Sequence, residues 1–316
     1  MSASATIPAP EPIAAALPGP AAADAIGLEP IERLRRRWPM VLAGVLTVAM
    51  IAGLAHELFD RGLVALDRTI PDNPLYYLAF AAFYFVPPLA DWIIFRRLWS
   101  IPFAGMAALL KKRVMNEVVI GYSGEAYFYA WARERMRMVA APFGAVKDVM
   151  ILSAMAGNAI TLTMLAVALP FAQGLLTPAQ FQTGLWSAGF IMATSLPFII
   201  FSRRVYTLAR PVLWWIFGVH CARLVAGSAL IALAWHWAMP EVGLGMWLFL
   251  AAARLLVSRL PLVPNKDLLF ANFAILLIGQ GDDLSELIAF TAALTLLCHI
   301  VCILGFGIDA LVRRKR

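Results

Sequence analysis

Charged residues are scarce in this chain of 316 residues: Asp, Glu, Lys and Arg together make up 14%, against about 25% in a soluble domain. Hydrophobic residues make up 62%, well above the roughly 45–50% of soluble proteins. So little charge cannot cover the surface of a soluble protein of this length. The composition therefore excludes a soluble globular fold and predicts an all-α polytopic membrane protein.

Cysteine is also rare, with three residues at Cys221, Cys298 and Cys302. All three lie inside apolar segments, which argues against a disulfide framework. Cys298 and Cys302 are one helical turn apart, with His299 between them. We interpret them as packing residues on one helix face, with a metal site as the alternative. We predict no metal ligand.

The motifs of soluble enzymes are missing. The sequence contains no nucleotide-phosphate loop, no H-E-x-x-H motif and no Ser/His/Asp arrangement that spacing would support. We therefore predict no catalytic residue, no cofactor and no enzymatic activity. The net charge of +7 sits in short clusters beside apolar runs. That pattern is typical of membrane orientation, so no nucleic-acid partner is expected.

The chain divides into three parts. Residues 1–30 are rich in Ala and Pro and contain no aromatic residue, which predicts a disordered tail. Residues 31–312 form a single transmembrane domain, and residues 313–316 form a basic cytoplasmic tail. A bilayer crossing needs about 20 apolar residues, and six stretches qualify: 39–58, 74–95, 145–169, 183–201, 211–237 and 284–309. Pro87 and Pro88 should kink or break the second crossing, with Asp91 following on the way to the interface.

Two further apolar regions, near 114–132 and 244–279, are interrupted. If both are hairpins that leave the membrane on the side they entered, 20 of the 26 Lys and Arg residues fall on inside segments when the N-terminus is inside. Only Arg61 and Arg68 then fall in outside loops. A single crossing at either region would place basic clusters outside, against the positive-inside rule. The pattern predicts two re-entrant hairpins, with both termini cytoplasmic.

The two hairpins should enter from opposite sides, because three full crossings separate them. Their turns lie near residues 121–124 and 260–265. Opposed re-entrant elements are typical of inverted-repeat transporters. Non-helical backbone at membrane depth must be buried in protein or line an aqueous cavity. We therefore predict about six full transmembrane helices plus two opposed re-entrant helical hairpins around a central polar cavity.

The candidate headgroup-binding residues lie mainly at these two turns. Glu125 is either a headgroup or proton-coupling ligand, or a carboxylate that caps the restarted helix. Lys266 is an anion contact, and Asp267 either joins it or caps the second restarted helix. The full set is Asn116, Glu117, Gly121, Gly124, Glu125, Arg223, Arg254, Arg259, Asn265, Lys266 and Asp267.

Several of these residues have a second interpretation. Glu117 could pair with the basic cluster at residues 111–113, and Arg254 and Arg259 could extend toward outer headgroups. Arg223 is one turn from His220 inside a predicted crossing. An Arg at that depth should face the bundle interior, where it binds a phosphate or pairs with a carboxylate.

The two turn segments resemble motifs of a known family. Residues 121–125, Gly-Tyr-Ser-Gly-Glu, resemble the P-G-R-x-G-E motif of the membrane domain of lysylphosphatidylglycerol synthase/flippase proteins. Residues 260–268 resemble its later L-P-x-x-P-G-G-L-G motif, with Asn265, Lys266 and Asp267 in place of the glycines. No aminoacyltransferase domain follows, so lysyl-lipid synthesis is not expected. The resemblance implies handling of a lipid or lipid-linked headgroup.

The sequence thus predicts an inner-membrane protein of the flippase or transporter kind that binds an anionic lipid headgroup between opposed hairpins. The alternative is a non-transporting scaffold or accessory subunit of an envelope lipid or polysaccharide synthesis complex. The expected partners are a membrane lipid or lipid-linked substrate, together with either a second copy of the chain or an envelope-synthesis protein.

Overall fold

The computed structural model describes residues 70–118, 123–135, 143–168, 206–260, 263–278 and 283–314, and four isolated positions between 182 and 193. Every regular element in these ranges is helical, in agreement with the predicted all-α class. The chain divides into two units, Met1–Pro39 and Met40–Arg316, and all described residues belong to the second. The predicted tail, the crossing at 39–58, almost all of the crossing at 183–201 and Gly121 lie outside the described residues.

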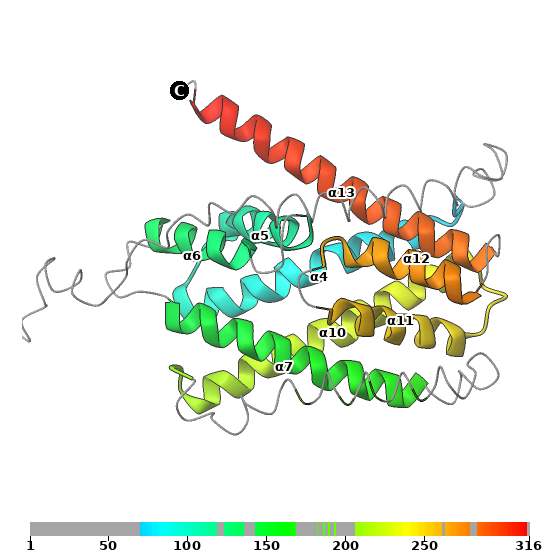
Figure 1. Cartoon of the computed structure of the whole chain (residues 1–316). Helices are drawn as coiled ribbons and strands as arrows, with labels where there is room; N and C mark the ends of the chain where they lie inside the picture. The colour runs from blue at the N-terminus through cyan, green and yellow to red at the C-terminus, as the bar shows by residue number, and fades with distance from the viewer. Residues whose placement is uncertain are drawn as a thin grey trace, which may run out of the picture. The chain divides into compact units, whose positions relative to one another are not determined.

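Four helices are long and apolar enough to cross a membrane. They are α4 (Pro74–Trp99), α7 (Phe143–Ala168), α10 (Arg210–Ala238) and α13 (Asp283–Arg314) (Figure 1). They correspond to four of the six predicted crossings. Large apolar side chains such as Leu78, Trp214 and Leu304 are exposed on them. Those exposed faces fit a multi-pass membrane protein in contact with lipid.

Of the two predicted effects of Pro87 and Pro88, a kink or a break in the second crossing, the break is wrong, because α4 continues through both residues. A proline removes one helical N–H, so Pro88 leaves the carbonyl oxygen of Tyr84, four residues earlier, without its helical donor. The guanidinium of Arg113, from the neighbouring helix α5, donates a hydrogen bond to that oxygen. A side chain from the first predicted hairpin thus supplies the bond that the proline removes.

Helices α5 (Met106–Val118) and α6 (Ser123–Arg135) form the first hairpin, preceded by the short 3₁₀ helix η1 (Phe103–Gly105). The two helices run antiparallel. The Lys111 ammonium lies 4.7 Å from the centre of the Tyr127 ring near the middle of the pair. Near its open end Gly105 lies against the Trp131 side chain. The hairpin is longer at both ends than the predicted 114–132.

Helices α11 (Leu244–Ser258) and α12 (Lys266–Ile278) form the second hairpin, within the predicted 244–279. Trp247 of α11 and Phe270 of α12 both pack on Trp235 of α10, with ring centres 5.8 and 6.3 Å from it. Near the other end, Arg254 pairs with Asp267 across the two helices. These contacts define a helical hairpin whose open end lies at the C-terminal end of α10.

The two hairpins lie at opposite ends of α4. Phe128 of the first packs on Phe95, in the C-terminal half of α4. Arg254 of the second lies over the ring of Phe83, closer to its N-terminal end. Two separate hydrophobic cores result, one around each hairpin. Figure 1 shows α5 and α12 approaching each other from opposite directions alongside α4.

The two ends of this bundle differ in charge. The end with the open side of the first hairpin carries Arg96, Arg97, Arg133, Lys147 and Arg210. At the other end, residues 70–80, 230–250, 270–278 and 283–290 contain no Lys or Arg. Such an imbalance is the one that the positive-inside rule describes.

Candidate functional site

The tips of the two hairpins touch through their backbones. Glu117 lies at the C-terminal end of α5, where the last carbonyl groups of a helix have no internal donor. The N–H of Asn265, just before α12, donates a 2.6 Å hydrogen bond to the Glu117 carbonyl oxygen. Asn265 adopts a left-handed backbone conformation, with φ of 46°. Asn tolerates this region better than most residues.

The first tip is held by its own polar side chains. The side-chain oxygen of Asn116 accepts a 2.8 Å hydrogen bond from the N–H of Gly124, and the Ser123 hydroxyl donates to the Met115 carbonyl. Gly124 lies so close to the Lys112 carbonyl that any Cβ at this position would collide with backbone. Asn116 and Gly124, two of the predicted site residues, therefore close the hairpin.

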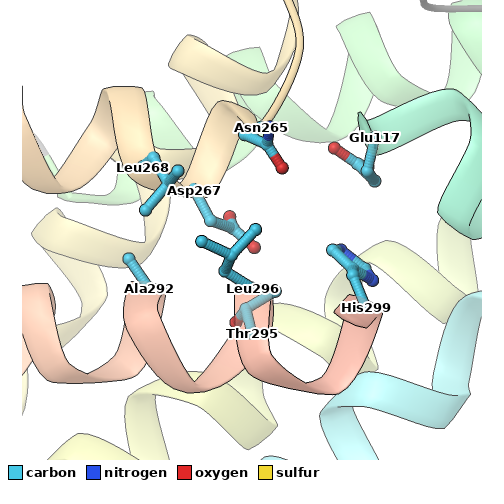
Figure 2. Close-up of a pocket in the computed structure, with 8 residues that line it drawn as sticks. All are labelled: Glu117, Asn265, Asp267, Leu268, Ala292, Thr295, Leu296 and His299. Carbon is cyan, nitrogen blue, oxygen red and sulfur yellow. The ribbon is translucent and has the colours of Figure 1, made fainter. Parts of the chain in front are cut away.

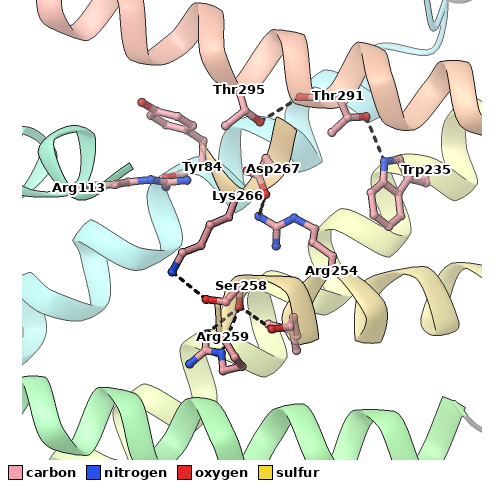
Figure 3. A network of polar contacts seen from close by, with 11 residues as sticks. Tyr84, Arg113, Trp235, Arg254, Ser258, Arg259, Lys266, Asp267, Thr291 and Thr295 are labelled. Atoms are coloured by element: carbon pink, nitrogen blue, oxygen red, sulfur yellow. Dashed lines mark hydrogen bonds and ion pairs between the residues drawn. The ribbon is translucent and has the colours of Figure 1, made fainter. Parts of the chain in front are cut away.

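The second tip carries three of the predicted cations (Figure 3). The Arg254 guanidinium lies 2.7 Å from the Asp267 carboxylate, and the Lys266 ammonium donates a 2.9 Å hydrogen bond to the Ser258 carbonyl. Arg259 donates to the Ser258 hydroxyl and lies against Gly157 of α7, where a Cβ would collide with its guanidinium. Asp267 lies in the first turn of α12, which begins at Lys266, so it lies inside the helix and not at the N-cap; its negative charge still favours the N-terminal end of the helix.

Between the tips a small pocket opens (Figure 2). Its cavity volume is about 10 Å³, close to the space that one water molecule needs, and it is lined by Glu117, Asn265, Asp267, Leu268, Ala292, Thr295, Leu296 and His299. In Figure 2, Glu117 and Asn265 lie along one edge, with Asp267 and His299 on the other sides. Two carboxylates from different hairpins thus face one pocket.

Only one of these carboxylates is directly paired. Asp267 has Arg254 at 2.7 Å, whereas Glu117 has no ion pair within 4 Å among the described residues. Both residues lie outside the four candidate spans. Burial raises the pKa of the Glu117 carboxyl above its ordinary value, and the neighbouring Asp267 carboxylate raises it further. Lys266, Arg113 and Arg254 oppose that rise.

His299 connects the pocket to α4. Its Nδ1 shares a 2.9 Å hydrogen bond with the Tyr84 hydroxyl, and Arg113 lies over the Tyr84 ring at 4.2 Å. The Tyr84 hydroxyl also lies 3.7 Å from the Cys302 sulfur. Within the described ranges no group of three His, Cys, Asp or Glu residues is placed to hold a metal ion.

A second charged cluster lies between the first hairpin, α4 and α10. Lys112 is 2.7 Å from Asp91 and 3.5 Å from Glu125. Arg223 is 3.9 Å from the other oxygen of Asp91 and donates a 2.7 Å hydrogen bond to Ser153 of α7. Arg223 therefore pairs with a carboxylate, one of its two predicted roles. Asp91 is 7% exposed, so its carboxylate is enclosed by protein; its depth relative to the membrane interface stays a prediction.

Both clusters lie near the middle of the candidate spans. Tyr84 and Asp91 flank the centre of α4, Arg223 lies at the centre of α10, and Thr295 at that of α13. Charge at this depth is costly in lipid, so it must be enclosed by protein or water. The charges of the two hairpin tips therefore form an internal polar layer between two apolar cores.

The structure brings ten of the eleven predicted residues into or beside this layer; the eleventh, Gly121, lies outside the described residues. The sequence did not predict five further residues of this polar layer, which are Tyr84, Asp91, Lys112, Arg113 and His299. One signal was available for Asp91, because a carboxylate inside an apolar run is costly wherever it lies. The sequence assigns Lys112 and Arg113 to a basic flank, since nothing in it shows that α5 turns inward.

Comparison with protein-family models, with curated proteins and with solved structures finds no match for this chain. The resemblance to lysylphosphatidylglycerol synthase/flippase proteins therefore stays a prediction from two short segments.

Proposed function

We propose that this protein binds an anionic lipid or lipid-linked headgroup between two opposed re-entrant hairpins and moves it across the inner membrane. The observation that carries the proposal is the meeting of the hairpin tips, Glu117 with Asn265, at the middle of the candidate spans. Such a junction separates the two ends of the bundle. Opening it on either side gives a headgroup alternating access to one central site.

The charge around the junction favours an anion. Three cations, Arg113, Arg254 and Lys266, act on the Glu117 carboxyl, together with one other carboxylate, that of Asp267. With both carboxylates ionised the group keeps a net positive charge of one. α12 also begins here, and its N-terminal N–H groups favour a phosphate or another anion.

The basic end of the bundle supports an inner-membrane orientation with both termini cytoplasmic. The first hairpin would then dip from the cytoplasm and the second from the outside. Each hairpin has its open side at one end of α4 and its tip near the middle, which is the geometry that re-entry requires.

A lipid-scrambling assay tests the proposal. Purified protein is reconstituted into phosphatidylcholine vesicles that contain a fluorescent phosphatidylglycerol. A membrane-impermeant quencher then removes the fluorescence of lipid in the outer leaflet, so any further loss of fluorescence measures lipid that has moved out of the inner leaflet. We expect translocation by the wild type and a clear loss with Glu125→Gln and with Lys266→Ala. Glu134→Gln, an exposed change on α6, serves as the control. Identical rates in all variants and in empty vesicles contradict the proposal.

A second function is favoured by the pairing of the cations. Arg254 is neutralised by Asp267, while Lys266 and Arg113 are bound to backbone carbonyl groups. Such a closed network also suits a scaffold or accessory subunit of an envelope-synthesis complex, which needs rigidity and no substrate path. Purification in mild detergent distinguishes the two. A scaffold brings down a stoichiometric partner, whereas a flippase is recovered alone or as a homo-oligomer.

A further inference from the structure

The Glu117 carboxyl differs from the other carboxyl groups of the polar layer. Asp91, Glu125 and Asp267 each have a cation within 4 Å. Glu117 has none among the described residues, yet it faces the pocket between the hairpins together with Asp267. Two carboxylates that share a small, half-buried site cannot both ionise without cost, and the one without a direct ion pair is the one that takes up a proton.

We propose that Glu117 is a proton-binding site whose protonation is coupled to anion binding at the hairpin junction. The inference rests on the proposed function and names its coupling ion. The proton comes from water and is held on the Glu117 carboxyl, which becomes neutral. The local group formed by Arg113, Arg254, Lys266, Asp267 and Glu117 then gains one positive charge, and its attraction for an anionic headgroup increases.

Every element packed around Glu117 contributes to this balance. Helix α12 provides Asp267 and Lys266, α11 provides Arg254, and α5 itself provides Arg113. From α13, His299 lines the same pocket, and its Nδ1 is engaged by the Tyr84 hydroxyl of α4. His299 is 2% exposed. The Tyr84 hydroxyl therefore already engages the ring, whereas the Glu117 carboxyl has no ion pair within 4 Å among the described residues, so Glu117 is the group of the pocket to which we assign the proton.

The position of Glu117 links its charge to the junction. Its carbonyl oxygen accepts the hydrogen bond from Asn265, while its side chain faces the pocket. The same residue therefore carries the backbone contact that closes the tips and the group that titrates. A Gln at this position keeps the backbone contact and imitates the neutral carboxyl, so Glu117→Gln isolates the protonation step from the closure.

Reciprocity gives the sign of the coupling. If protonation strengthens anion binding, anion binding must cause proton uptake, and affinity must fall as pH rises. For one coupled proton the affinity changes at most about tenfold per pH unit. A neutral headgroup should show no such dependence.

The experiment is isothermal titration calorimetry on the full chain in detergent, with short-chain phosphatidylglycerol and, as the neutral probe, short-chain phosphatidylcholine. Titrations in buffers of different ionisation enthalpy give the number of protons taken up per lipid bound. For the wild type we expect uptake approaching one proton and an affinity that falls as pH rises. Glu117→Gln should bind phosphatidylglycerol without proton uptake and with a flat pH profile, and Glu134→Gln should behave as the wild type.

Three results separate the hypotheses. Binding of phosphatidylglycerol without proton uptake by the wild type overturns the coupling and leaves the proposed function standing. Equal proton uptake by Glu117→Gln and the wild type also overturns the assignment to Glu117. No binding of phosphatidylglycerol at any pH overturns both. If Glu117→Gln does not fold, the pH slope of the wild type alone decides, because a flat slope rules out coupling.

Discussion

The N–H of Asn265 and the carbonyl oxygen of Glu117 are 2.6 Å apart, and this one hydrogen bond joins the tips of two hairpins from distant parts of the chain. It satisfies a carbonyl at the end of α5 that the helix itself leaves unpaired. It also fixes the relative position of the cations on the second hairpin and the Glu117 carboxyl on the first.

Replacing Asn265 tests the left-handed backbone at the junction. Its φ of 46° is poorly tolerated by β-branched residues. Asn265→Val should lower the free energy of unfolding by about 1–2 kcal/mol, measured by thermal or denaturant unfolding in detergent. Asn265→Gly keeps the conformation and should stay close to the wild type. Equal losses in both variants would show that the side chain, and not the backbone conformation, matters.

Replacing Gly124 with Ala tests how closely α5 and α6 pack against each other. A Cβ at this position would meet the Lys112 carbonyl, which is backbone and cannot move aside easily. Gly124→Ala should cost roughly 1–3 kcal/mol, as overpacking does. Gly218→Ala on α10 is the matched control, because no atom lies within 4 Å of a Cβ there. A helix-favouring change at that open site should be neutral or slightly stabilising.

Replacing Asp267 tests how much the Arg254–Asp267 ion pair stabilises the second hairpin. Its side chains are 17% and 23% exposed, so the pair lies between a surface pair and a fully buried one. Asp267→Asn should therefore lower the free energy of unfolding by roughly 1–3 kcal/mol. Asp72→Asn, an exposed change just before α4, should be neutral. A neutral Asp267→Asn would mean that Arg254 finds another partner.

Cross-linking tests whether the tips must separate. In a background free of Cys221, Cys298 and Cys302, the pair Glu117→Cys and Asn265→Cys should form a disulfide on oxidation, because the two backbones are in contact. We expect the oxidised double variant to lose the translocation that the same variant shows when reduced, measured by the scrambling assay. Each single-cysteine variant is the control. Continued translocation by the cross-linked protein would show that the junction does not open during transport.

Single-cysteine labelling tests the orientation. In the same cysteine-free background, cysteines at Ser100 and Ser202 should react only from the inside, and a cysteine at Thr177 only from the outside. Membrane-impermeant maleimide added to intact and to permeabilised cells distinguishes the two. Labelling of Ser100 and Ser202 from opposite sides would contradict the paired hairpins.

The sequence by itself determined the helical membrane class of the protein and the location of the four long helices that the structure describes. Low charge and long apolar runs can only be satisfied by helices in lipid, because each helix bonds its own backbone. Local signals also located the two interruptions, since a glycine-rich or proline-containing break in an apolar run is visible without tertiary contacts. The placement of Lys and Arg predicts that the hairpins enter from opposite sides, and this orientation stays a prediction.

Only the tertiary structure decided which charges meet. Asp91 looked like an interfacial residue, yet Lys112 from α5 and Arg223 from α10 enclose it. Pro88 looked like a helix breaker, yet Arg113 supplies the donor that the Tyr84 carbonyl lacks. Both contacts join residues of different helices. The attraction between them depends on distance in space, which spacing along the chain does not encode.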